Sequence, residues 1–215
     1  MSIDAKAANG CDSMTAAVSS VSNTQTVPGR ECGSCTLCCK VYNVVELGKA
    51  AGKWCSHCKP GRGCTIHDSL PSECAAFNCL WKTMPSMSMQ WKPDQSKMVL
   101  TLHPGTNNIH AVVDPGQPSA WTREPYHGQL RLLSKTNMTK GHLVVVLVNE
   151  QATLILPDQD VPLGVLKPEQ VISVTLEAGP NGSVYDVKIF SRRMTADGQT
   201  LEMASTSRHP VRSAA

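Results

Sequence analysis

Cysteine is the residue type in this sequence whose number and spacing point to chemistry. Nine of the ten cysteines lie between residues 32 and 79. Within this stretch the spacing of Cys-x-x-Cys or Cys-x-x-His recurs, at Cys32/Cys35, Cys35/Cys38, Cys55/Cys58 and Cys64/His67. Thiolates bind soft or borderline metals, and a Cys-x-x-Cys turn lets two of them reach one ion. A hydrophobic core does not require such clustering, so the pattern predicts a bound metal ion or iron–sulfur cluster.

The predicted ligands are more numerous than one tetrahedral site can use. They are Cys32, Cys35, Cys38, Cys39, Cys55, Cys58, Cys64, Cys74 and Cys79. Two four-ligand sites, or one cluster with one ion, fit this count. The side chains of adjacent Cys38 and Cys39 diverge, so we expect them to serve different centres, or one of them to be no ligand. Cys11 stands alone and is expected to be a free thiol.

The sequence leaves the metal open between zinc and an iron–sulfur cluster. Cys32, Cys35 and Cys38 match the first three ligands of a bacterial ferredoxin run, but the fourth cysteine and its following proline are missing. His57 and His67 favour zinc, because imidazole is a common zinc ligand. Each of the two can also be read as a surface residue. The other histidines are expected to be structural or exposed: His103, His110, His127, His142 and His209.

The order and spacing of these cysteines resemble the YkgJ-like zinc- or iron-chelating family. The resemblance rests on Cys-x-x-Cys-x-x-Cys-Cys, Trp54-Cys55-Ser-His-Cys58, Gly63-Cys64-Thr-Ile-His67 and Pro71-Ser-Glu-Cys74 through Trp81. It implies a metal or iron–sulfur site with ligand roles for Cys32, Cys35, Cys38, Cys39, Cys64 and Cys74, extended to Cys55, Cys58 and Cys79. This chain has Leu70-Pro71 where that family usually has Arg-Pro. A related cysteine cluster in flagellin lysine methylases implies that an enzymatic use exists, although no SAM-binding glycine loop is visible here.

Composition describes a globular chain in a reducing compartment. Hydrophobic residues make up 41% and charged residues 17% of the 215 residues, with a net charge of +3. No Lys/Arg block or basic-aromatic stripe is present, so we expect no nucleic-acid partner. No run of about eighteen apolar residues occurs, so no membrane span is expected. The first 27 residues lack the apolar core of an export signal, and we therefore expect a cytoplasmic protein with reduced thiols.

The rest of the chain predicts an α+β protein: a small irregular cysteine-rich metal-binding module followed by a mainly antiparallel β domain with one helix. We expect a flexible leader over 1–28, the module over 29–92, the β-rich domain over 93–193 and a disordered tail over 194–215. Frequent Gly and Pro in the module exclude long helices, so bound metal is expected to supply much of its folding energy. The Met/Trp passage 81–91 is expected to fill gaps in the packing, with copper(I) binding as the alternative.

Hydrophobic alternation predicts three hairpins and one helix in the β-rich domain. The hairpins pair 98–102 with 109–113, 143–148 with 153–156, and 172–176 with 185–189, and the helix covers 122–135. Asp158 and Asp160 are interpreted as turn residues. The run Leu143 to Val148 is apolar throughout, which predicts a central strand covered on both faces.

These patterns favour a metal-binding protein that serves interaction, metal handling or sensing, with an unidentified protein partner. The alternatives are an iron–sulfur redox or protein-modifying enzyme and an exported, disulfide-stapled protein. No catalytic base, nucleophile or phosphate-binding loop can be nominated from spacing, so a catalytic role is the less favoured interpretation.

Overall fold

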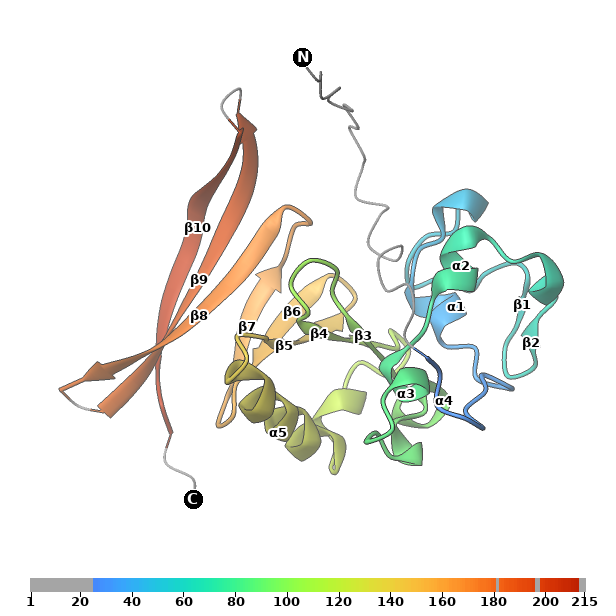
Figure 1. The fold of residues 1–215 in the computed structure, drawn as a ribbon, viewed down its shortest axis with the longest axis horizontal. Helices are drawn as coiled ribbons and strands as arrows, with labels where there is room; N and C mark the ends of the chain where they lie inside the picture. The colour runs from blue at the N-terminus through green and yellow to red at the C-terminus, as the bar shows by residue number, and fades with distance from the viewer. Residues whose placement is uncertain (1–24, 181, 196–197, 213–215) are drawn as a thin grey trace, which may run out of the picture.

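The computed structural model describes residues 25–180, 182–195 and 198–212. Figure 1 shows the cysteine-bearing part of the chain at one end and a three-stranded sheet at the other, with a five-stranded sheet between them. Residues 1–24 of the predicted leader over 1–28, which include Cys11, lie outside the described residues. The fold is mixed α+β, as the sequence predicts. No helix among the described residues is long and apolar enough to cross a membrane.

The five-stranded sheet has the order β3-β4-β5-β6-β7. Its strands are β3 Met98–Leu102, β4 Ile109–Val113, β5 Val144–Val148, β6 Gln151–Ile155 and β7 Asp160–Val165. Neighbouring strands pair antiparallel except β4 and β5, which run parallel. Parallel neighbours need a long crossover, and α5 (Tyr126–Met138) lies within the one that joins them.

The three-stranded sheet has the order β10-β9-β8 and is antiparallel throughout. It consists of β8 Gln170–Gly179, β9 Gly182–Thr195 and β10 Gly198–Pro210. The three predicted hairpins are therefore confirmed as β3–β4, β5–β6 and β8–β9. The position of the predicted helix is also confirmed, although it starts at Tyr126, directly after Pro125.

Two expectations about the β-rich part are wrong. The tail predicted to be disordered contains β10, which pairs with β9 by backbone hydrogen bonds from Gly198 to Pro210. Nearly every residue of β10 is exposed, so the strand lacks the apolar alternation that marks a half-buried strand. Asp160 begins β7 and does not lie in a turn. Pro162 and Gly164 lie inside β7, and both residue types have a low β propensity, so the sequence does not predict this strand.

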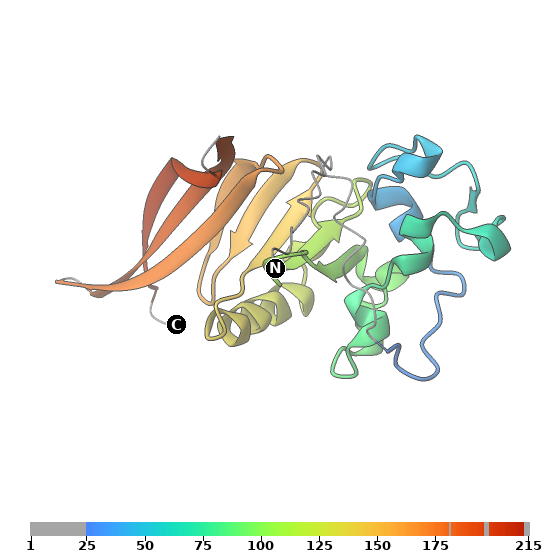
Figure 2. The same cartoon turned by 45° about the horizontal axis from the view of Figure 1, so that its top comes forward.

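The central strand β5 is apolar because both faces of its sheet are covered. Val144 and Val146 pack with Leu130 of α5 and with residues of the cysteine-bearing part in one core. Val145 packs with Tyr185 and Val187 of β9 in a second core. Figure 2 shows α5 lying along one face of the five-stranded sheet, with the three-stranded sheet beyond the last strands.

Short elements alone build the cysteine-bearing part, as the many glycines and prolines predict. They are α1 Cys38–Val41, η2 Val45–Leu47, β1 Cys58–Lys59, β2 Gly63–Cys64, η3 His67–Ser69, α2 Ser72–Ala76, α3 Leu80–Thr83, η4 Met89–Trp91 and α4 Pro93–Ser96. Trp81, Met87 and Trp91 are buried in the first core, in keeping with the packing interpretation of that passage. Between residues 45 and 76 only Cys58 and Pro71 are buried. That stretch therefore gains little stability from apolar packing.

The helix α5 offers a matched pair of leucines that tests this packing. Leu130 is 0% exposed and Leu132 is 63% exposed. We expect Leu130→Ala to lower the free energy of unfolding by about 2–5 kcal/mol, because it leaves a cavity in the core. Leu132→Ala, the control, should change it by less than about 0.5 kcal/mol. Urea denaturation measures both, and equal effects of the two substitutions would contradict the burial of Leu130.

Candidate metal centre

All nine cysteines that the structure describes are free thiols. Among the described residues, no three or more Cys, His, Asp or Glu side chains already stand in an arrangement that holds a metal ion. The thiols nevertheless fall into two neighbourhoods, which we name the pocket group and the hairpin group. The pocket group is Cys32, Cys35, Cys38 and Cys79. The hairpin group is Cys39, Cys55, Cys58, Cys64 and Cys74.

The pocket group lines one small cavity of about 30 Å³ together with Phe77, Trp81, Lys82, Pro93 and Val99. A turn closed by the hydrogen bond from Cys35 N to Cys32 O, 2.8 Å long, sets the first two cysteines beside each other. Cys38 begins α1, and Cys79 directly precedes α3. Three cysteines close together in the sequence and the distant Cys79 therefore line one cavity.

Burial and hydrogen bonding set the proton affinities in the pocket group. Burial raises the pKa of Cys35 to about 11, although the backbone N–H of Leu37 donates to its sulfur and opposes the shift. Burial also raises the pKa of Cys79, against the hydrogen bond from the backbone N–H of Lys82 and the positive charge of that lysine. Backbone N–H groups aimed at sulfur are suited to stabilise thiolates.

Two buried polar atoms beside this cavity have no hydrogen-bond partner among the described residues. They are Trp81 Nε1 and Asp94 Oδ1. Trp81 lines the cavity, and the charge of Asp94 acts on Cys35. A buried donor or acceptor without a partner costs about 1–3 kcal/mol, so such atoms call for an explanation. Trp81 Nε1 is a donor and would be satisfied by a thiolate sulfur, whereas the carboxylate of Asp94 disfavours a thiolate at Cys35.

Backbone contacts and a small hairpin assemble the hairpin group. Cys55 N donates to Cys39 O at 3.0 Å, and Cys58 N donates to Cys55 O at 3.0 Å. Cys58 and Cys64 are direct partners across β1 and β2, so their side chains share one face. The pKa of Cys74 is raised to about 11, first by burial and then by the charges of Cys39, Cys55 and Cys64. These cysteines are therefore close enough to interact electrostatically.

Cys39 is the most acidic thiol of the hairpin group. Hydrogen bonds from Cys38 and Cys58, together with the charge of Lys49, lower its pKa to about 6 against the effect of burial. The Cys38 and Cys39 sulfurs lie 4.0 Å apart, and the pKa of Cys38 is raised because Cys38 donates to Cys39. The pKa of Cys58 is raised to about 11, mainly by burial.

Lys49 brings positive charge to the hairpin group. Its ammonium donates to the carbonyl oxygens of Lys40, at 2.8 Å, and Tyr42. Burial lowers the pKa of Lys49, whereas the charges of Cys39, Cys55, Cys38 and Cys74 raise it. Only three N–H donors are available on the ammonium, and two point at the backbone. The lysine is thus fixed in place near these thiols.

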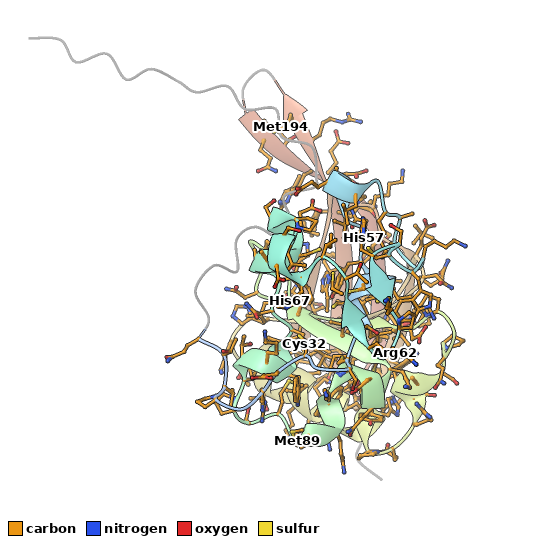
Figure 3. All side chains as sticks on the ribbon, turned by 90° about the vertical axis from the view of Figure 1, so that its right-hand side faces the viewer. Cys32, His57, Arg62, His67, Met89 and Met194 are labelled. Atoms are coloured by element: carbon orange, nitrogen blue, oxygen red, sulfur yellow. The ribbon has the colours of Figure 1, made fainter. Side chains whose placement is uncertain are left out.

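The two candidate histidine ligands belong to the cysteine-bearing part of the chain. His67 is exposed and His57 is partly exposed. Figure 3 looks onto this end of the molecule, where His57, His67 and Cys32 are labelled. The ligand role of the two histidines stays a prediction.

One ion-pair cluster was not foreseen from the sequence. His127 Nε2 lies 2.8 Å from Asp160 Oδ2, and Arg131 contacts the other carboxylate oxygen at 3.3 Å. The partners are about thirty residues apart in sequence, so no local spacing could reveal them. The cluster joins α5 to β7, and we assign it a structural role.

The order of thiol acidity can be tested by alkylation. In metal-free, reduced protein at pH 7, Cys39 should react with iodoacetamide faster than Cys35, Cys58 and Cys74, because the thiolate is the reactive form. Its rate should rise through about pH 6 and then level off, whereas the other three rates should keep rising towards pH 11. Peptide mass spectrometry gives each rate. Cys38→Ala removes the donor to Cys39 and should shift the plateau of Cys39 to higher pH; parallel pH profiles at all four thiols would refute the order.

No family model matches the chain, and no curated protein or solved structure matches it. The resemblance to the YkgJ-like family therefore stays a prediction based on its cysteine spacing.

Proposed function

We propose that this chain is a metal-binding protein whose cysteine thiolates hold zinc or another soft ion, for interaction, metal handling or sensing. The observation that carries the proposal is the convergence of nine unbridged thiols on two small neighbourhoods, each with a lysine beside it. Packing in a hydrophobic core does not require cysteines to cluster in this way. Ion binding explains both the clustering and the nearby positive charge.

The donor set fits a metal ion. The pocket group supplies four sulfurs, which is the number of a closed tetrahedral site. Its cavity of about 30 Å³ is close to the volume of one water molecule, which suits a single ion better than a multi-iron cluster. Trp81 Nε1 is a buried donor that a thiolate sulfur would satisfy. For these reasons we favour zinc over an iron–sulfur cluster.

An ion bound by thiols of the hairpin group would stabilise the part of the chain that lacks a core, because Cys55, Cys58, Cys64 and Cys74 lie within it. Residues 45–76 bury only two side chains, whereas Leu80, Trp81 and Trp91 belong to the main core. Structural zinc contributes about 10–16 kcal/mol in small zinc-binding peptides, more than enough to order such a stretch. We infer a reducing compartment such as the cytoplasm, because thiols that bind metal must stay reduced.

Elemental analysis of protein purified anaerobically tests the proposal. We expect stoichiometric zinc and a colourless solution. Strong absorption near 400 nm would instead show that the bound group is an iron–sulfur cluster. Protein that neither carries metal nor takes up added zinc would overturn the proposal.

Removing the metal should speed up amide hydrogen exchange in residues 45–76 but not in β5. After chelation, amide hydrogen exchange should speed up by at least tenfold across 45–76, because the ion and not apolar packing holds that stretch. Amides of β5, which lie between the two cores, should exchange at an unchanged rate and serve as the internal control. Unchanged exchange across 45–76 after complete loss of metal would contradict the stabilising role.

A further inference from the structure

We propose that the thiols form two adjacent metal centres, one held by Cys32, Cys35, Cys38 and Cys79 and the other by four thiols of the hairpin group. This inference rests on the proposed function and assigns its ligands. It goes beyond the spacing in the sequence, which does not say which cysteines meet.

The first centre is defined by the cavity. The four cysteines of the pocket group line it, and no cysteine of the hairpin group does. Two of them come from the turn before α1, one from α1 itself and one from the residue before α3. Cys79 is separated by more than forty residues from Cys32, so only the fold brings it to this set.

The second centre is defined by backbone contacts and charge. Cys39 and Cys55 are joined through the Cys55 N–H and the Cys39 carbonyl, and the Cys39 thiol hydrogen bonds to Cys58. The charges of three thiols, Cys39, Cys55 and Cys64, act on Cys74 together with that of Glu73. The hairpin group has five thiols, and a tetrahedral ion takes four of them.

The two centres divide at α1. Consecutive helical residues project about 100° apart, so Cys38 faces the cavity while Cys39 faces the hairpin. Their sulfurs are 4.0 Å apart, which makes this contact the point where the two centres meet. The expectation that the side chains of Cys38 and Cys39 diverge is wrong for their sulfurs, which meet in this contact. One ion cannot use nine thiolates, and the lining of the cavity, which includes Cys38 and not Cys39, separates the nine into four and five.

Each centre has its own lysine. Lys82 lines the cavity and acts on Cys79, whereas Lys49 is fixed by two carbonyl oxygens near Cys39, Cys55 and Cys74. An ion with a charge of +2 bound to four thiolates leaves a net charge of −2. Two such centres side by side repel each other, and a separate positive charge at each reduces that cost.

Cobalt(II) loading of the full-length reduced protein tests the division. We expect about two cobalt ions per chain in the unsubstituted protein and about one in each of two variants, Cys35→Ser and the double variant Cys55→Ser/Cys74→Ser, because each leaves only three thiols in the affected group. In Cys35→Ser, alkylation should reach Cys32 and Cys79 while Cys39, Cys55 and Cys74 stay protected. The pattern should be reversed in the double variant, with Cys39 alkylated and with Cys32, Cys35 and Cys79 protected.

A variant that changes a charge and no ligand tests the division even if the cysteine variants misfold. Lys82→Met removes no ligand and should weaken cobalt binding about two- to fivefold at the first centre only, leaving protection of Cys39, Cys55 and Cys74 unchanged. Exposure of both thiol groups in this variant, or one ion per chain in the unsubstituted protein, would overturn the two-centre assignment and leave the proposed function standing. Failure of the unsubstituted protein to bind cobalt would overturn the proposed function itself.

Discussion

Several ionised thiols can share a small space only when positive charge lies among them. In this protein burial, and then the charges of Cys39, Cys55 and Cys64, raise the pKa of Cys74 to about 11. Lys49 and Lys82 supply positive charge, but two lysines cannot neutralise nine thiolates. Metal ions would meet this requirement, since each accepts the lone pairs of four sulfurs. We propose that metal ions supply that charge within residues 32–79.

The rest of the fold supplies a rigid wall for this arrangement. Val99 of β3 and Pro93 of α4 line the cavity next to Cys35 and Cys79. Met98, Val99 and Leu100 are at most 3% exposed, so the strand behind the thiols is held on both faces by apolar packing. Arg30 ties the entry of the chain to the same wall through hydrogen bonds to Trp81 O, Met84 O and Met87 O. The thiols therefore converge on a firm side of the molecule.

Sequence reasoning succeeded where one local pattern decides the structure. Alternation at Met98, Leu100 and Leu102 marks a strand with different surroundings on its two faces, and β3 is found there. It failed where the determinant is distant. β10 exists because β9 offers a backbone edge, and Cys79 reaches Cys35 only through the packing of α3 on β3. The set of candidate ligands could thus be read from spacing, but its division into two groups could not.

X-ray absorption at the edge of the bound metal tests the central claim most directly, because it reports the atoms around the ion without a substitution. The account predicts a first shell of about four sulfurs at about 2.3 Å. A shell of nitrogen and oxygen, with the sulfurs absent, would contradict it.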